Sequence, residues 1–232
     1  MASETVLITG SGRGLGRELA LVFAEHNYNL ILNSRGEINH EFREEMLSMG
    51  SDVHHVVGDI REIGVMDRLV DLAKREDISV LINNAGAPTE GCTLDELSYD
   101  EVMETITTNL ISPIYLTKGI YPLLKEKGRG TIINLNSMIG LECKEFKGIG
   151  SAARWGLRGF TGSIRPEMEK DGINVVGVYP TKIKTKPEYE FGFEPREVAE
   201  RIYRACADGF SGMIKMDGRP EEFKPKKDIE YG

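Results

Sequence analysis

The chain has 232 residues, of which 40% are hydrophobic and 28% charged, as in an ordinary globular domain. Its net charge of −8 excludes the basic face that nucleic-acid binding needs. The three cysteines, Cys92, Cys143 and Cys206, show no metal-ligand spacing, so we expect reduced thiols and no metal site. No apolar run reaches the length of a membrane span, and no signal-peptide pattern precedes the first strand. We therefore expect a cytoplasmic protein with neither membrane nor nucleic-acid partners.

Short apolar segments alternate with amphipathic segments along the chain. The first, TVLITG, is typical of a buried strand that leads into a turn. The pattern predicts strands over 5–10, 29–34, 52–59, 78–86, 129–137, 173–180 and 212–218. It predicts helices over 14–28, 37–50, 63–76, 98–126, 152–169 and 194–209, with Ser98 or Asp100 as the cap of the long helix.

Several of these strands are apolar on both faces, which indicates a parallel sheet covered by helices on each side. The sequence therefore predicts an α/β fold: a single-domain Rossmann fold over residues 1–232, with a doubly wound parallel sheet of about seven strands flanked by helices. The polar, proline-containing tail over 219–232 is expected to be loose or packed on a partner.

The loop TGSGRGLG, from Thr9 to Gly16, lies between the first strand and the first helix. Glycines there let the backbone approach a pyrophosphate, and the helix N-terminus supplies N–H donors and a positive dipole end. A plain glycine-rich turn is the alternative, but the position after strand one favours dinucleotide binding. A P-loop is excluded because no Gly-Lys-Ser/Thr follows.

This loop resembles the Thr-Gly-x-x-x-Gly-x-Gly loop of classical short-chain dehydrogenases/reductases. The segments NNAG at 83–86, GDI at 58–60, INLNSMIG at 133–140 and YPTKIKT at 179–185 resemble further motifs of that family in the same order, with Thr181 in place of a glycine. The resemblance covers almost the whole chain. It implies a nicotinamide cofactor in contact with Gly10, Ser11, Arg13, Gly14, Leu15, Gly16, Ser34, Arg35, Asp59, Ile60, Asn83, Ala85, Gly86, Arg154, Pro180, Thr181, Ile183 and Thr185.

The end of the second strand distinguishes NAD from NADP binding, because NAD-binding proteins place an acidic residue there for the ribose 2′-hydroxyl. This chain has Ser34 and Arg35 at that position, and Arg13 lies within the glycine loop. Guanidinium groups suit a 2′-phosphate because their planar fork matches phosphate oxygens. We predict that NADP(H) is preferred over NAD(H); the alternative is that both arginines are solvated surface charges.

The resemblance implies that Ser137 and a tyrosine bind the substrate oxygen, and that a lysine four residues after the tyrosine binds the nicotinamide ribose. This chain has Gly150 at the tyrosine position and Arg154 at the lysine position. Glycine cannot transfer a proton, whereas arginine can still donate to ribose hydroxyls. The proton-donor position is therefore vacant, while Asn109 matches the family's structural asparagine in the long helix.

Three explanations of the missing tyrosine stay open. Another group donates the proton: Tyr179, a water at Gly150, or a residue of the loop that holds Glu142, Cys143, Lys144 and Lys147. Alternatively the reaction needs little acid assistance, as in iminium or activated-alkene reduction, or the chain binds NADP(H) without redox chemistry, as a sensor or assembly partner.

The substrate is expected to be a small molecule, and the resemblance implies a homodimer or homotetramer. We interpret His54 and His55, which point to opposite faces of a strand, as structural residues.

Overall fold

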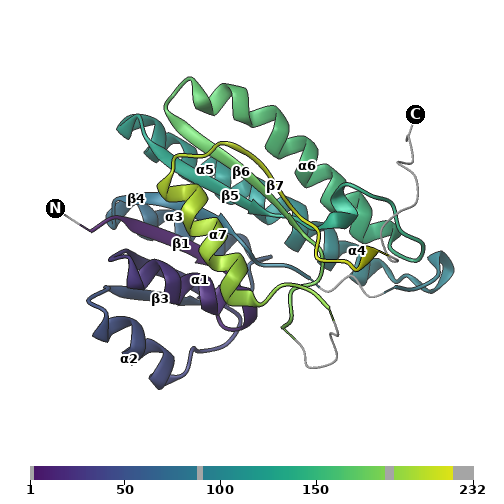
Figure 1. Ribbon diagram of the computed structural model, residues 1–232, viewed down its shortest axis with the longest axis horizontal. Coiled ribbons are helices and arrows are strands. Elements are labelled where there is room, and N and C mark those ends of the chain that lie inside the picture. The colour runs from purple at the N-terminus through teal and green to yellow at the C-terminus, as the bar shows by residue number, and fades with distance from the viewer. Residues whose placement is uncertain (1–2, 88–90, 186–190, 222–232) are drawn as a thin grey trace.

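The computed structural model of the protein describes residues 3–87, 91–185 and 191–221. These residues form one parallel sheet of seven strands in the order β3-β2-β1-β4-β5-β6-β7 (Figure 1). The order reverses between β1 and β4, which is where a doubly wound sheet opens a crevice at the carboxyl ends of its strands. The strands are β1 (Thr5–Thr9), β2 (Asn29–Ser34), β3 (Val53–Val57), β4 (Ile78–Asn83), β5 (Gly130–Leu135), β6 (Ile173–Pro180) and β7 (Gly212–Met216).

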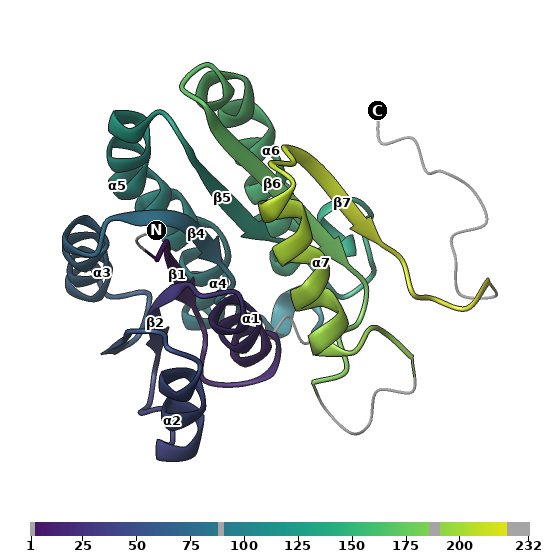
Figure 2. The same ribbon diagram turned by 60° about the vertical axis from the view of Figure 1, so that its left-hand side comes forward.

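Helices cover both faces of the sheet, as Figure 2 shows. On one face α1 (Gly14–Glu25), α2 (His40–Ser48) and α7 (Pro195–Ala207) pack on one hydrophobic cluster. On the other face α3 (Ile63–Arg75), α5 (Ser112–Lys127) and α6 (Gly148–Glu169) pack on a second cluster. The predicted α/β fold with a seven-stranded, doubly wound parallel sheet is confirmed.

The long helix predicted over 98–126 is interrupted. The α4 helix (Tyr99–Ile106) ends in a π-helical turn (Thr107–Ile111), after which α5 begins. Pro113 lies at the start of α5 and has no N–H, so it cannot donate to the carbonyl of Asn109 as a continuous α-helix would require. The wider turn accommodates this loss, and it places Asn109 at the centre of an irregular segment beside α6.

Other boundaries differ from the predicted ones by a few residues. The α6 helix begins at Gly148, four residues before the predicted start, so Gly150 lies inside its first turn. Ser98 caps α4, because its hydroxyl accepts a hydrogen bond from the Glu101 N–H and the Glu101 carboxylate accepts from Ser98. No helix in the described part of the chain has both the length and the apolar composition to cross a membrane.

Candidate functional site

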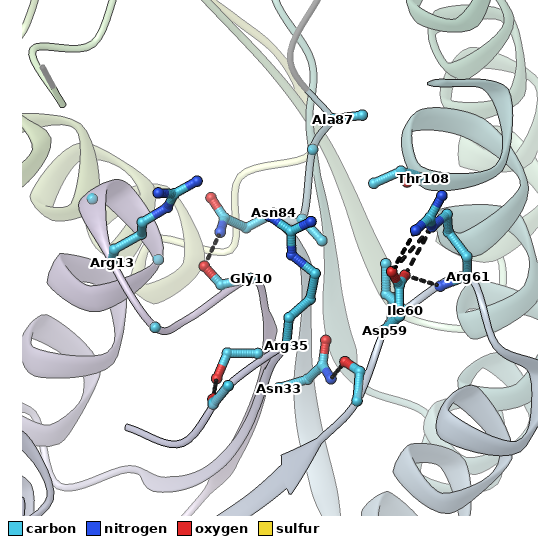
Figure 3. Close-up of a pocket in the computed structure, with 18 of the residues that line it drawn as sticks. Gly10, Arg13, Asn33, Arg35, Asp59, Ile60, Arg61, Asn84, Ala87 and Thr108 are labelled. Atoms are coloured by element: carbon cyan, nitrogen blue, oxygen red, sulfur yellow. Dashed lines mark hydrogen bonds and ion pairs between the residues drawn. The ribbon is translucent and has the colours of Figure 1, made fainter. Parts of the chain in front are cut away.

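A cavity of about 520 Å³ opens at the carboxyl ends of β1, β2 and β4 (Figure 3). It coincides with the crevice expected where the strand order reverses. Of the predicted cofactor-binding residues, those that line it are Gly10, Arg13, Gly14, Leu15, Gly16, Ser34, Arg35, Asp59, Ile60, Ala85, Gly86 and Thr185.

The glycine loop packs directly against the segment that follows β4. Gly10 has a φ of +66°, and a Cβ there would lie 2.8 Å from the Ala85 Cα. The Asn84 side chain donates hydrogen bonds to the carbonyls of Thr9 and Gly10, at 2.8 and 3.1 Å. A Cβ on Gly16 would lie only 2.1 Å from the Gly10 carbonyl oxygen. At Gly10 and Gly16 the loop therefore has room for backbone alone, as a loop whose backbone approaches a ligand closely requires.

The N-terminus of α1 faces this cavity without a side-chain cap. Arg13 occupies the N-cap position in an extended conformation, and its side chain makes no capping hydrogen bond. The first helix turn also contains no acidic residue. The free N–H groups and the positive end of the helix dipole are consequently available to an anion.

Two arginines contribute unpaired positive charge to the same cavity. Figure 3 shows the Arg35 side chain between Gly10 and Asp59, with Arg13 on the far side of Gly10. Neither guanidinium makes a hydrogen bond or an ion pair with any residue in the described ranges. Glu37, which no sequence motif indicates, lines the cavity as well, but its carboxylate lies 3.3 Å from His55 Nδ1.

Asp59 is held by Arg61 rather than left open. The Arg61 guanidinium donates to both carboxylate oxygens of Asp59, at 2.7 to 3.1 Å, and the Arg61 backbone N–H donates at 2.9 Å. These hydrogen bonds lower the pKa of Asp59, and the nearby charge of Arg35 lowers it further. Arg61 also lies 3.8 Å from Glu104. The carboxylate expected next to the adenine is thus already engaged.

Several predicted cofactor residues do not line the cavity. The Ser11 hydroxyl is buried and donates to the Asn33 carbonyl at 3.1 Å. The Asn83 side chain points into the core, where it donates to Asn134 at 2.8 Å. The Thr181 hydroxyl accepts from the Gly218 N–H, and Pro180 is buried at the end of β6. Ile183, likewise outside the lining, packs on the first hydrophobic cluster.

Arg154 and Asn109 form a connected pair behind the cavity. One Arg154 nitrogen donates to the Leu135 carbonyl at 2.6 Å, and another donates to Asn109 Oδ1 at 3.3 Å. Asn109 Oδ1 also accepts from the Ala87 N–H at 3.0 Å. Burial lowers the pKa of Arg154 to about 10, so it stays protonated at neutral pH. Its guanidinium lies 3.1 Å from where a Cβ of Gly86 would be, next to the cavity wall.

The remaining catalytic candidates lie apart from the cavity lining. The Ser137 side chain is partly buried and forms no hydrogen bond within the described ranges. Gly150 is buried in the first turn of α6. Tyr179 is only 2% exposed, and its hydroxyl would lie 3.1 Å from a Cβ of Gly177, two residues back on the same strand. Burial raises the pKa of Tyr179. This phenol is packed inside the protein and does not face the cavity.

The loop after Ser137 is tied to the end of the chain that the structure describes. Arg219 donates to both carboxylate oxygens of Glu142, at 2.7 and 2.9 Å, and also to Asp217. These contacts are partly buried. Glu142 is therefore fixed in an ion-pair network, and the first residue of the predicted tail is held in place. Residues 222–232 of that tail, and 186–190 before α7, lie outside the described residues.

Sequence reasoning missed ten residues of the lining. Asn84 and Gly12 lie inside motifs that the sequence analysis had singled out, so their neighbours gave a signal. Arg61 follows the GDI segment and Thr108 precedes Asn109, whereas Glu37 and Glu104 carried none. The missed residues are Gly12, Asn33, Gly36, Glu37, Gly58, Arg61, Asn84, Ala87, Glu104 and Thr108.

Among the residues described, no group of three or more His, Cys, Asp or Glu side chains is placed to hold a metal ion.

This arrangement agrees with comparisons to known proteins. A family model described as short chain dehydrogenase matches residues 4–191. The chain belongs to the short chain dehydrogenase family. Within this family it is 31% identical over 227 residues to the ketoacyl reductase HetN of Nostoc sp., covering 92% of this chain and 79% of that protein. It is 30% identical over 188 residues to a D-beta-hydroxybutyrate dehydrogenase of Rhizobium meliloti, covering 79% and 72%.

Solved structures of the family share the fold. An NADPH complex of a short-chain dehydrogenase from Sphingobium yanoikuyae superposes with a TM-score of 0.82 at 22% identity, covering 91% of this chain and 87% of that one. A variant of an actinorhodin polyketide ketoreductase with NADPH gives 0.83 at 25% identity, covering 93% and 96%. The oxidoreductase class rests on the family model and on the curated relatives, which are named as reductases and dehydrogenases.

Proposed function

We propose that the protein is an NADP(H)-dependent oxidoreductase that acts on a carbonyl, alcohol, imine or activated alkene of a small molecule, by a mechanism without the usual tyrosine. One observation carries this proposal: Arg13 and Arg35 present unpaired guanidinium groups in the same cavity as the uncapped N-terminus of α1. Unpaired cations together with free helix N–H groups suit a ligand with several phosphates.

The cavity lining and the residues beside it have separate roles in this proposal. The loop from Gly10 to Gly16 and the start of α1 hold the pyrophosphate, and Ser34 and Arg35 hold the 2′-phosphate with Arg13. The bound nicotinamide supplies the hydride chemistry. Arg154 holds the nicotinamide ribose from behind Gly86, and the unpaired Ser137 hydroxyl orients the substrate oxygen.

The proton donor is the atypical part of the site. Gly150 has no side chain, Tyr179 is packed away from the cavity, and Glu142 is occupied by Arg219. A solvent proton, or a substrate that needs little acid assistance, fits these constraints. Losing a general acid costs about 10² to 10⁴ in rate, so we expect slow turnover of simple ketones compared with imines or activated alkenes.

The second candidate function is cofactor binding without redox turnover. The same three observations on Gly150, Tyr179 and Glu142 favour it, because of the proton donors considered they leave only water and the Cys143, Lys144 and Lys147 side chains. The two functions separate when NADPH oxidation is followed with a panel of ketones, imines and activated alkenes. An enzyme consumes NADPH with at least one substrate and slows down in Ser137→Ala. A pure binder gains thermal stability with NADP(H) but oxidises none.

The expected homodimer or homotetramer belongs to the proposal as well. Three large apolar side chains, Tyr99, Met103 and Ile111, are exposed along α4 and the π-helical turn. Exposed apolar side chains that gather on one helical segment suit a subunit contact. Sedimentation of the purified chain tests this, and a monomer at micromolar concentration contradicts it.

Replacing Arg35 by alanine tests the cofactor preference. We expect NADPH to bind the original chain at least about tenfold more tightly than NADH, since one charge-assisted phosphate contact contributes about 1.5 kcal/mol or more. Arg35→Ala should weaken NADPH binding about tenfold and leave NADH binding nearly unchanged. Titration calorimetry with both cofactors measures this, with Arg204→Ala, whose guanidinium pairs with Glu200 on α7, as control. Tighter binding of NADH by the original chain contradicts the proposed preference.

A further inference from the structure

Ser34, His55 and Glu37 form a hydrogen-bonded chain at the end of the cavity that holds Arg35. Ser34 Oγ lies 2.8 Å from His55 Nε2, and His55 Nδ1 lies 3.3 Å from the Glu37 carboxylate. The His55 side chain is 5% exposed, whereas Ser34 and Glu37 both line the cavity. His55 comes from β3, the strand next to β2 in the sheet, so a buried imidazole is placed directly behind the Ser34 hydroxyl.

The Ser34–His55–Glu37 hydrogen bonds depend on whether His55 is neutral or protonated, because the Ser34 hydroxyl has too few hydrogens for all the acceptors near it. The Ser34 hydroxyl has one hydrogen and two acceptors within reach: the Gly36 carbonyl at 2.7 Å and His55 Nε2. A neutral His55 that donates from Nδ1 to Glu37 has a lone pair on Nε2, which requires the Ser34 hydrogen. A protonated His55 donates from both nitrogens, so the Ser34 hydrogen is released, and the Gly36 carbonyl and a bound 2′-phosphate then compete for it.

We propose that His55 is a positioning residue for cofactor selection: when protonated it turns the Ser34 hydroxyl into a donor toward the 2′-phosphate, so the preference for NADP(H) over NAD(H) strengthens as the pH falls. The inference rests on the proposed function of the cavity. In the neutral state the Ser34 oxygen presents only lone pairs to the cavity. That state suits the 2′-hydroxyl of NAD(H), which can donate, and opposes a phosphate, which cannot.

The charged groups around His55 set the pH at which its imidazole becomes protonated. Burial lowers the pKa of His55, and Arg43 from α2 lowers it further, while Glu37 from the loop after β2 raises it. A 2′-phosphate near Ser34 adds negative charge, so bound NADP(H) favours the protonated imidazole and raises its pKa. By linkage the 2′-phosphate binds more tightly below the pKa of the bound state, and this gain is lost as the pH rises through it.

The test uses adenosine 2′,5′-bisphosphate and adenosine 5′-monophosphate, which differ only in the 2′-phosphate. Their affinity ratio is measured between about pH 5.5 and 8 for the original chain, for His55→Gln and for His54→Gln. His54 is the matched control, because it lies on the same strand but pairs with Glu76 at 3.4 Å. The phosphate itself titrates near pH 6 in every variant, so the difference between variants isolates the histidine.

We expect the ratio to rise about tenfold more toward low pH in the original chain and in His54→Gln than in His55→Gln, as one hydrogen bond to a charged group would give. A His55→Gln variant with the same ratio and the same pH profile as the original chain overturns the inference and leaves the proposed function standing. An original chain that binds neither NADP(H) nor NAD(H) overturns the proposed function itself.

A second readout needs no variant. The imidazole proton resonances of the original chain are followed against pH with each nucleotide bound. We expect the midpoint for His55 to move to higher pH with the bisphosphate and to stay unchanged with the monophosphate. Equal midpoints overturn the inference even if His55→Gln fails to fold.

Discussion

Gly16→Ala should abolish dinucleotide binding, with a loss of more than about 100-fold in NADPH affinity, and should destabilise the fold by about 1–3 kcal/mol. The added methyl group would lie 2.1 Å from the Gly10 carbonyl oxygen and 2.7 Å from Asn84 Nδ2. Both are fixed groups: one is backbone, and the other donates to Thr9 and Gly10. The loop must move to make room, and the surface on which the pyrophosphate would rest moves with it.

Gly64→Ala is the matched control for this prediction. Gly64 also lies in the first turn of a helix, α3, and nothing lies within 4 Å of the position of its Cβ. That substitution should stabilise the protein by about 0.5–1 kcal/mol and leave NADPH binding unchanged. Thermal unfolding and NADPH titration of both variants measure the contrast. If Gly16→Ala binds NADPH as the original chain does, the loop is not the pyrophosphate site.

Arg154→Met should weaken NADPH binding about 100-fold, because it removes charge-assisted hydrogen bonds worth about 1.5–3 kcal/mol each. Two of the arginine's five N–H donors are used on Leu135 and Asn109, and we propose that the others bind the nicotinamide ribose. Without cofactor the unfolding free energy should change by less than about 1 kcal/mol, because an apolar side chain avoids the cost of burying a charge. The folded pKa of Arg154, about 10, lies below the ordinary pKa of arginine. Burial of the charge therefore opposes folding below pH 10, and this cost is relieved only as the pH rises above 10 toward the ordinary pKa.

Arg158→Met provides the comparison, since Arg158 lies one turn further along α6 and its guanidinium packs over the Trp155 ring. It should leave NADPH affinity unchanged. Calorimetric titration with NADPH and thermal unfolding without it are both needed. An Arg154→Met variant that loses stability but keeps its NADPH affinity would make Arg154 a structural residue and remove it from the proposed site.

The parts of the site that follow from local spacing were predictable from the sequence. Gly10, Gly14 and Gly16 line the cavity because a turn between a buried strand and a helix must bring those glycines to the crevice. The same argument placed Ser34 and Arg35 at the end of β2. Strand alternation also separated His54 from His55, which make contacts on opposite sides of β3.

Features that depend on contacts between distant segments were not predictable. The two asparagines of NNAG are adjacent, and only the packing of β4 decides that Asn83 enters the core while Asn84 reaches the glycine loop. Tyr179 lies next to the carboxyl end of β6, where the sequence analysis expected it near the nicotinamide, yet its ring folds back over Gly177. Glu37 contacts His55 across a loop and a neighbouring strand, so no short motif reports that pair.

The hydrogen bonds from Arg61 to Asp59 affect which purine bases the cavity can bind. With its oxygens already accepting four hydrogen bonds from Arg61, this carboxylate has little capacity left for the exocyclic amine of an adenine. Selection of the base then falls to other contacts in the cavity, among them the apolar side chain of Ile60. Nucleotides in which that amine is absent or closed into a ring should lose little affinity, which makes fluorescent etheno-adenine derivatives suitable reporters of occupancy.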